Sequence, residues 1–308
     1  MAIQRIILDT DIGTNPDDCL AMALVLASRE LELVAVTTVH GDVSLRARIA
    51  LKLLRLRGIH GLPVAMGADR PLLRKRPVYW AGHEGQGILE PADKALQPSK
   101  HHAVDLIMDA VMGRPGEITL VAIGPLTNVA LAFLREPRLA ENLAGLVVMG
   151  GVVGGTQALH LPRTEHNFRS DPEAAQLALR AVPAGAPVTI VPLDVTTQVF
   201  IRPHDLERIR TAGDAYHHAV AGQVSLYPPF VQRGWGYLHD PLAVAALIEP
   251  SLVTTEPLRA VVETAGEQTA GELLVALPVP DAPATADVAL EVDAPRAERF
   301  IVDRLAAG

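Results

Sequence analysis

The feature that most constrains the fold of this chain is the alternation of short apolar runs with helical patterns. The apolar runs are rich in Val, Ile and Leu and lack strict period-two alternation, which is typical of strands buried on both faces. They are Arg5–Thr10, Leu33–Val39, Pro63–Met66, Ile118–Ile123, Leu146–Met149 and Val188–Leu193. The helical segments between them are Asp17–Ser28, Leu45–Arg57, Ala103–Met112, Thr127–Arg135 and Pro172–Ala181. This order predicts βαβ crossovers and a doubly wound, mainly parallel α/β sheet with flanking helices.

Beyond about residue 200 the pattern becomes mainly helical. Helices are predicted at Pro203–Ala212, Asp214–Leu226 and Pro241–Ile248. The last part of the chain then suggests a few strands, such as Leu258–Glu263 and Glu272–Leu277, and a closing helix from Pro295. Because we find no internal repeat, low-complexity linker or clear boundary, we expect a single α/β domain over residues 1–308.

Composition and charge argue against several classes of protein. Of the 308 residues, 49% are hydrophobic but 4% aromatic, so the core must rely on Leu, Val, Ile and Ala. The net charge of −8 offers no basic face, and we expect no nucleic-acid partner. The single cysteine, Cys19, excludes an internal disulfide and fits a reducing compartment. The chain start lacks signal-peptide features and no stretch suits a membrane span, so we expect a soluble cytoplasmic protein.

The stretch LDTDIGTNPDDCLA, residues 8–21, carries four aspartates directly after an apolar run. Two of them, Asp17 and Asp18, have a simple explanation. Asn15 as N-cap and Pro16 at the first helical position would begin a helix, whose dipole favours acids in its first turn. Helix capping alone therefore accounts for this half of the cluster.

The other two aspartates, Asp9 and Asp11, have no such explanation. Residues i and i+2 of a strand lie on the same side, so both carboxylates should point the same way at the end of the strand. The loop that follows should return Asp17 and Asp18 to the same edge. Oxygen ligands without cysteine suit a hard divalent cation, although a hydrogen-bonded pair of structural aspartates remains the alternative.

Two long stretches, Gly67–His101 and Gly150–Asp171, interrupt the alternation of strands and helices. Both follow predicted strands. Loops of this length are uncommon unless they have a function, and open α/β sheets bind ligands at the carboxyl ends of their strands. We therefore expect both stretches to lie beside a ligand site.

A second polar group occurs far downstream, in GWGYLHDPLAVAAL. Asp240 is predicted as the N-cap of a helix with Pro241 at its first position. Capping explains Asp240 but not His239 before it. Capping does not explain Trp235 and Tyr237 just upstream either; their rings could stack on a planar ligand, with core packing as the alternative.

The chain resembles the inosine–uridine-preferring nucleoside hydrolase family in segments distributed over nearly its whole length. In order, they are ILDTDIGTNPDD, VTTVHGDVSL, PVAMGADRPLL, GHEGQGIL, ITLVAIGPLTNVAL, VVMGG, TEHNFRSDPEAA, PLDVTTQ and HDPLAVA. The resemblance implies a doubly wound α/β core, tightly bound Ca²⁺, and hydrolysis of the N-glycosidic bond of ribonucleosides to ribose and a free base. It also implies a small-molecule nucleoside substrate and a homodimer or homotetramer.

The same resemblance implies roles for individual residues. The calcium ligands would be the carboxylates of Asp11, Asp18 and Asp240 and the backbone carbonyl of Ile123. Asp11 would also be the base that deprotonates a calcium-bound water, with Asp9 in a supporting role. His239 would assist the leaving base, as a well-placed group that titrates near neutrality. The residues matched to substrate contacts, or suited to stacking on the base, are Asp17, Asp42, His83, Met149, Glu165, Asn167 and Trp235.

Several positions depart from the family pattern. The first acidic motif is two residues longer than usual. Asp42 and His166 stand where Asn and Phe are common, which bears on the preference for the sugar. Thr196 stands where His is common. Gln157 is the candidate for a ribose-binding Asn that the match does not supply.

Two further functions stay open on the sequence. The acidic stretch also resembles the DxDx[TV] loop of haloacid-dehalogenase-like phosphatases, which use Mg²⁺ and would form a phosphoenzyme on Asp9. Gly13 stands where that motif needs Thr or Val. The second alternative is a non-catalytic protein of the nucleoside hydrolase family that binds a nucleoside or sugar without turnover.

Overall fold

A nine-stranded sheet runs through the computed structural model, which describes residues 3–154, 160–182 and 187–307. Its order is β10-β9-β11-β6-β5-β4-β1-β2-β3. Neighbouring strands from β3 to β11 pair in parallel, whereas β9 and β10 are antiparallel to their neighbours. The strands are β1 Gln4–Thr10, β2 Leu31–Thr38, β3 Val64–Met66, β4 Ile118–Ala122, β5 Gly145–Met149, β6 Val188–Val191, β9 Val253–Val262, β10 Leu273–Ala276 and β11 Ala286–Val292. The expected mainly parallel sheet is confirmed.

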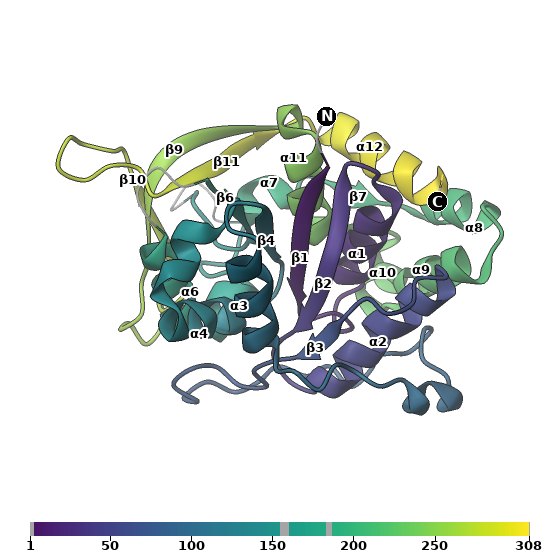
Figure 1. The fold of residues 1–308 in the computed structure, drawn as a ribbon. Helices are drawn as coiled ribbons and strands as arrows, with labels where there is room; N and C mark the ends of the chain where they lie inside the picture. Colours follow the sequence, from purple (N-terminus) through teal and green to yellow (C-terminus); the bar gives the residue numbers. More distant parts are fainter. Residues whose placement is uncertain (1–2, 155–159, 183–186, 308) are drawn as a thin grey trace.

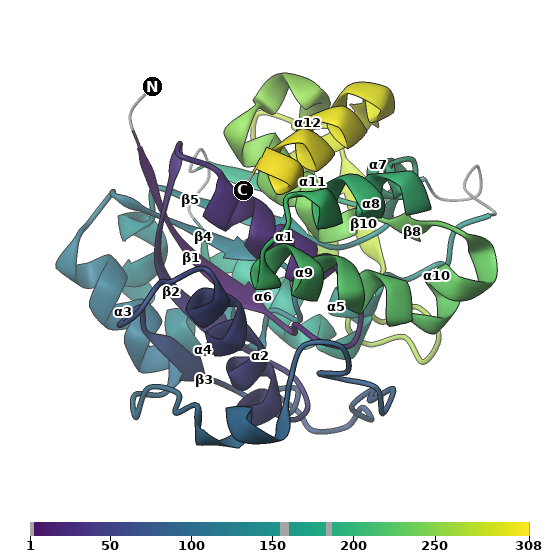
Figure 2. The same cartoon turned by 90° about the vertical axis from the view of Figure 1, so that its right-hand side faces the viewer.

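Helices cover both faces of this sheet, as the apolar strand pattern predicts. Along β1, Ile6 and Leu8 belong to one hydrophobic cluster and Ile7 to the other, all with 0% exposure. The first cluster is covered by α1 Asp17–Ala27, α2 Val43–Leu56, α8 Pro203–Thr211, α9 Ala215–Leu226, α11 His239–Ile248 and α12 Ala294–Ala307. The second is covered by α3 Ala103–Gly113, α4 Thr127–Arg135 and α6 Pro172–Ala181. Figures 1 and 2 show these two layers, so the fold is doubly wound.

Shorter elements complete the chain. They are the helices α5 His166–Ser170, α7 Leu193–Thr196 and α10 Pro228–Arg233, the 3-10 turns η1 Pro91–Ala95, η2 Pro137–Asn142 and η4 Pro250–Leu252, and a small sheet of β7 Phe200–Ile201 with β8 Gly236–Tyr237. In the part of the chain that the structure describes, no helix is both long and apolar enough to span a membrane.

The strand order reverses at β1, which pairs with β2 on one side and β4 on the other. Their crossovers therefore run in opposite directions and leave the carboxyl ends of β1 and β4 uncovered. Open α/β sheets bind ligands at such a switch point. The acidic stretch begins at the end of β1, so the topology brings it to this position.

The predicted starts of two helices were wrong. Helix α1 begins at Asp17 without a side-chain cap, and Asn15 instead accepts a hydrogen bond from the hydroxyl of Tyr227 at 2.9 Å. Helix α11 begins one residue before Asp240, which therefore lies inside the first turn and does not cap it. In both cases the polar side chain is directed to another contact or to the site.

Strand β11 was not predicted from the sequence, although it joins the antiparallel strands β9 and β10 to the parallel part of the sheet. It pairs in parallel with β6 and antiparallel with β9. Its sequence, ADVALEV, does alternate apolar and polar residues over much of its length. The signal was short and lay among charged residues, so it did not stand out from the surrounding pattern.

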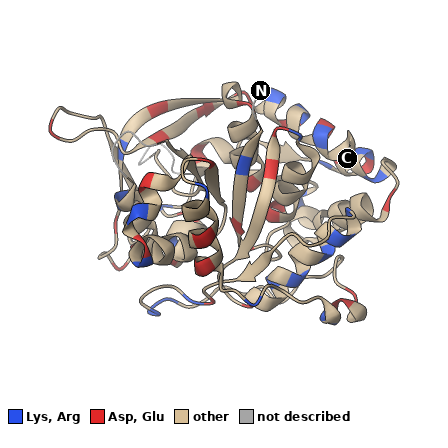
Figure 3. Cartoon of the chain, in the orientation of Figure 1, with Lys and Arg blue, Asp and Glu red and all other residues tan. Residues whose placement is uncertain are grey.

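An ion pair joins the last helix to the amino end of β2. The two terminal nitrogens of Arg304 donate to the carboxylate of Glu30 at 2.7 and 2.8 Å. Figure 3 shows acidic and basic residues interspersed along α12, where Arg304 lies. Hydrogen bonds from Arg304 lower the pKa of Glu30 to about 2. This pair lies at the amino end of β2, and therefore on the side of the sheet away from the carboxyl ends of the parallel strands.

Replacing Glu30 with Gln is expected to lower the free energy of unfolding at pH 7 by about 1 kcal/mol, as for a well-formed surface ion pair. Because the folded pKa of Glu30 lies below its ordinary value of 4.5, this stability is present above that value and is lost as the pH falls towards about 2. Urea unfolding of wild type and Glu30→Gln at several pH values between about 7 and 3 checks this. A difference between the two proteins that does not narrow in acid would contradict it.

Candidate active site

A cavity of about 250 Å³ opens at the carboxyl ends of β1, β4 and β5. Its lining comes from segments far apart in the sequence: the loop after β1, the first turns of α1 and α11, the ends of β4 and β5, and the segment around α5. The lining residues are Asp11, Thr14, Asn15, Asp17, Asp18, Tyr79, Ile123, Met149, Pro162, Thr164, Glu165, His166, Asn167, Arg169, Leu193, His239 and Asp240. Most of the site residues expected from the sequence are therefore together in one place.

Three carboxylates form the most concentrated charge in this cavity. Oxygens of Asp17, Asp18 and Asp240 lie within 4.8 Å of one another, and each residue is at most 5% exposed. Burial, followed by the neighbouring carboxylates, raises the pKa of Asp18 and Asp240 well above the ordinary value. Burial raises the pKa of Asp17 to about 7. Clustered anions this deeply buried are costly without a counter-charge, and their oxygen atoms suit a hard divalent cation.

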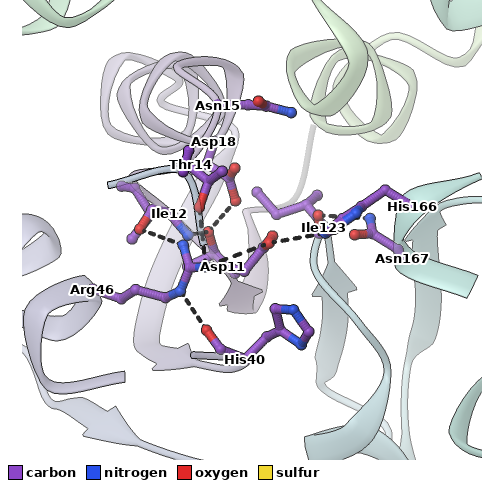
Figure 4. A network of polar contacts seen from close by, with 12 residues as sticks. Asp11, Ile12, Thr14, Asn15, Asp18, His40, Arg46, Ile123, His166 and Asn167 are labelled. Atoms are coloured by element: carbon purple, nitrogen blue, oxygen red, sulfur yellow. Dashed lines mark hydrogen bonds and ion pairs between the residues drawn. The ribbon is translucent and has the colours of Figure 1, made fainter. Parts of the chain in front are cut away.

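The loop after β1 places Asp11 beside these carboxylates, with 6% of its surface exposed. Figure 4 shows its carboxylate directed into the cavity region between Ile123, Asn167 and the acidic loop. One of its oxygens lies 3.9 Å from the guanidinium of Arg46 and 3.8 Å from Nε2 of His166. Asp11 is thus a buried carboxylate in the cavity lining, with the Arg46 guanidinium and the His166 ring near it.

The edge of the cavity at β4 and β5 is held by two residues of the segment around α5. Glu165 caps α5 and accepts hydrogen bonds from the backbone of Asn167 at 2.6 Å and Gly151 at 3.3 Å. Burial raises the pKa of Glu165. The side chain of Asn167 donates to the carbonyls of Ile123 at 2.9 Å and Met149 at 3.1 Å. Asn167 therefore links the ends of two strands at the cavity.

His239 lies on the opposite side of the cavity, at the first position of α11. Its Nδ1 is hydrogen-bonded to the hydroxyl of Thr196 at 2.7 Å, and its ring lies 4.7 Å from that of Tyr237. Burial lowers the pKa of His239 to about 4, so the imidazole is neutral at pH 7. From the sequence, His239 was expected to titrate near neutrality. The structure differs because the ring is enclosed by aromatic and apolar neighbours.

Three residues with predicted site roles lie outside the lining of this cavity, and a fourth belongs to a segment that the structure does not describe. Asp42 is exposed and caps α2, accepting from the backbone of Leu45 at 2.9 Å. His83 donates to the carbonyl of Thr14 at 2.7 Å. Trp235 packs against the rings of Phe200 and Tyr237 at 5.0 and 4.9 Å. Gln157 lies outside the described residues. The substrate contacts of these four stay predictions.

The supporting acid Asp9 is completely buried in the sheet. It accepts hydrogen bonds from the hydroxyl of Thr37 and from the side-chain amide of Asn128, the latter at 2.8 Å. Burial raises its pKa to about 7. A phosphatase mechanism would need this carboxylate to attack a substrate, and its enclosure argues against that role.

Some residues at the site were not predicted from the sequence. Tyr79 lines the cavity and belongs to the long stretch Gly67–His101. The length of this stretch indicated a ligand site, but no motif pointed to Tyr79 itself. Arg46 was also missed, although it lies on the buried stripe of α2 with Ala47, Ile49 and Ala50. An arginine on an apolar helix face is a signal that could have drawn attention to it.

Comparisons with known proteins agree with this geometry. The profile described as inosine-uridine preferring nucleoside hydrolase matches residues 6–299. The non-specific ribonucleoside hydrolase RihC of Salmonella paratyphi C is 36% identical over 301 residues, which cover 94% of this chain and 93% of that protein. The purine-preferring ribonucleoside hydrolase from Gardnerella vaginalis is 30% identical, with a TM-score of 0.87 over 99% of this chain and 98% of its own.

A plant nucleoside hydrolase, the PpNRh1 enzyme, is similarly close in structure. It has 29% identity and a TM-score of 0.87, and the match covers 99% of each chain. The family profile and these relatives extend over nearly the whole sequence and not over the acidic motif alone. The chain therefore belongs to the inosine-uridine preferring nucleoside hydrolase family, whose members are N-glycosyl hydrolases that act on ribonucleosides.

Proposed function

We propose that this chain is a calcium-dependent N-ribohydrolase, which cleaves the N-glycosidic bond of a ribonucleoside and releases ribose and the free base. The observation that carries the proposal is the group of buried carboxylates at the switch point of the sheet, in a chain of this family. The names of the relatives support a ribonucleoside as the substrate.

The residues present fit a calcium ion. The carboxylates of Asp11, Asp18 and Asp240 and the carbonyl of Ile123 would hold it, and all four residues line the cavity. These are oxygen donors, which Ca²⁺ prefers, and their number leaves positions for water and for sugar hydroxyls. When bound, the ion supplies positive charge that stabilises the clustered carboxylates and lowers the pKa of a neighbouring water molecule.

Asp11 is the proposed general base. It accepts a proton from the attacking water, whose oxygen forms a bond to the anomeric carbon while the bond from that carbon to the base nitrogen breaks. The sugar becomes positively charged in the transition state, as in glycoside cleavage generally. The surrounding carboxylates stabilise that charge because they lie in a cavity of low dielectric.

Four residues are proposed to bind the ribose: Asp17, Met149, Glu165 and Asn167. Glu165 and Asn167 are held by backbone hydrogen bonds, so their orientation is set before the substrate binds. Asp17 is at the first turn of α1, beside the proposed calcium ligands. Such fixed contacts orient the anomeric carbon towards the water, which lowers the entropic part of the barrier.

His239 is proposed to assist departure of the base. Because its ring is neutral, it acts as a hydrogen-bond donor to the leaving nitrogen heterocycle, and the electron pair of the broken bond passes to that heterocycle. The hydrogen bond to Thr196 holds the ring in place. The proton that the base finally takes up comes through His239 or from solvent.

Replacing His239 with Ala is expected to lower kcat for natural ribonucleosides by about 100-fold or more, the range of a positioned proton donor. The loss should be much smaller for p-nitrophenyl riboside, whose leaving group needs no proton. Steady-state kinetics on both substrates measures the difference. Equal losses on the two substrates would argue against a role at the leaving group.

We also propose that residues 1–308 act as one catalytic domain, since the family profile matches residues 6–299. We further propose a cytoplasmic location and a homodimer or homotetramer, because the chain resembles this family. Size-exclusion chromatography with light scattering measures the oligomeric state. A monomer with full activity would contradict the oligomer.

A panel of ribonucleosides tests the proposed function. Inosine, adenosine, guanosine, uridine and cytidine, with 2′-deoxyinosine as a control, are incubated with the calcium-loaded protein, and reducing sugar is measured. We expect ribose from at least one ribonucleoside and much slower release from the deoxy control, which lacks one of the hydroxyls available to the site. Calcium binding without turnover of any nucleoside would favour the non-catalytic alternative.

A further inference from the structure

Arg46 of α2 is a completely buried arginine beneath the acidic loop. Its Nε donates to the carbonyl of His40 at 2.6 Å, and one terminal nitrogen donates to the carbonyl of Ile12 at 3.0 Å. The other terminal nitrogen donates to the hydroxyl of Thr14 at 3.1 Å and lies 3.9 Å from the carboxylate of Asp11. Figure 4 shows these contacts: the side chain of Arg46 reaches Asp11, Ile12 and Thr14 of the loop, as well as His40.

A buried guanidinium is costly unless its donors are satisfied and its charge is compensated. Here the donors are used on backbone carbonyls and a hydroxyl, and Asp11 supplies the opposite charge. The guanidinium also lies 5.0 Å from the centre of the Trp80 ring, which covers it. Because the planar fork meets several acceptors at once, it fixes the loop in one geometry, which a single point charge would not do.

Thr14, in the lengthened part of the acidic motif, connects this arrangement to a second segment. Its hydroxyl donates to a carboxylate oxygen of Glu84 at 3.1 Å, and its carbonyl accepts from His83 at 2.7 Å. Glu84 in turn accepts from the backbone of Ala81 and Gly82, each at 2.7 Å. The segment of residues 81–84, held by these hydrogen bonds, is thereby joined to Arg46 through one hydroxyl group.

Two residues close to the contacts of Arg46, Gly13 and His40, have positive φ angles, which residues with a side chain rarely adopt. Gly13 has φ +120°, and a Cβ there would lie 2.7 Å from a methyl group of Ile49. His40 has φ +65°, although it is not glycine, and it is its carbonyl that accepts from Arg46. Such conformations persist where surrounding contacts enforce them, and they cluster at functional sites. The contacts of Arg46 are of this enforcing kind.

We propose that Arg46 is a positioning residue for Asp11. It holds the loop of residues 11–14 against α2, which sets the direction of the Asp11 carboxylate, and through Thr14 it couples this loop to the segment of residues 81–84. The consequence for catalysis rests on the proposed role of Asp11 as base and calcium ligand. The consequence for the loop itself does not depend on that role.

The test replaces Arg46 with Met, which keeps the length of the side chain but removes every donor. Arg304→Met is the control, because Arg304 forms a bidentate pair with Glu30 at the amino end of β2, away from the cavity. Melting temperature, calcium affinity by titration calorimetry with CaCl₂, and kcat and KM on the best ribonucleoside are measured for both. Calcium affinity is a readout that does not need turnover.

We expect Arg46→Met to lower kcat at saturating calcium and to weaken calcium binding, each by about 10- to 100-fold, as for outer partners of metal ligands. KM should change less than kcat, because the ribose contacts come from other segments. Arg304→Met should lower the melting temperature alone. If Arg46→Met keeps wild-type kcat and calcium affinity and loses only thermal stability, Arg46 is structural and the proposal is wrong.

A second variant covers the case in which Arg46→Met does not fold. Thr14→Val keeps the volume of the side chain and removes the hydroxyl that joins Arg46 to Glu84. It should lower kcat about threefold or more, and combined with Glu84→Gln its effect should be less than additive, because both changes break one connection. Full additivity would contradict the coupling.

A wild-type protein that binds calcium but releases no ribose would instead contradict the proposed function. In that case, calcium affinity would still test the role of Arg46.

Discussion

Replacement of Asp11 by Asn is expected to lower kcat by about 10²- to 10⁴-fold, the range for loss of a general base. The amide has almost the same shape and can still accept a hydrogen bond, but it cannot take the proton of the attacking water. Because Asp11 is also a proposed calcium ligand, the variant is assayed over a calcium titration and kcat is taken at saturation. Ribose release under these conditions separates loss of the base from loss of the ion.

Asp303→Asn is the control for this substitution, since Asp303 is exposed on α12 and pairs with Arg208 away from the cavity. We expect wild-type kcat from it. An Asp11→Asn protein that is folded, saturated with calcium and within about tenfold of wild-type kcat would remove Asp11 from the mechanism, because a missing base costs more than that.

Removal of calcium is expected to abolish turnover and to destabilise the folded protein. A ligand that binds only the folded state at a thousand times its dissociation constant stabilises it by about 4 kcal/mol, and this is lost in chelator. The physical reason is the cluster of Asp17, Asp18 and Asp240, whose buried negative charges repel one another without a cation. Thermal melts and ribose assays before and after treatment with EGTA measure both effects.

Two controls identify the site that is responsible. Addition of excess CaCl₂ should restore the melting temperature and the activity, and MgCl₂ should restore less because Mg²⁺ demands a stricter octahedral geometry. Asp240→Asn should show a smaller calcium-dependent rise in melting temperature than wild type. If EGTA changes neither activity nor stability in wild type, the carboxylates do not hold a dissociable calcium ion and the metal proposal fails.

The fold could be predicted from the sequence to the level of layers but not to the level of strand order. Buried parallel strands are visible in a sequence as short apolar runs, so β1 and β5 were predicted at nearly the observed bounds. The place of β11 between β6 and β9 depends on its pairing with β6, whose residues lie about a hundred positions earlier in the sequence. Local periodicity contains no information on such partners.

The site shows the same division between local and distant determinants. The motif letters led to Asp11, Asp18 and Asp240, which the fold brings to one cavity. The low pKa of His239 could not be predicted, because it depends on which rings enclose the imidazole. The contacts of Arg46 with the acidic loop likewise arise from the packing of α2 against it, which no single motif describes.

The most direct test of the central claim is the mass of the products formed in H₂¹⁸O. Calcium-loaded protein is incubated with its best ribonucleoside, and ribose and base are analysed by mass spectrometry. We expect ribose that carries one ¹⁸O atom at the anomeric carbon and an unlabelled base, with both products formed about 10²- to 10⁴-fold more slowly by Asp11→Asn. Unlabelled ribose, or a calcium-loaded wild-type protein that forms neither product, would contradict hydrolysis of the N-glycosidic bond at this site.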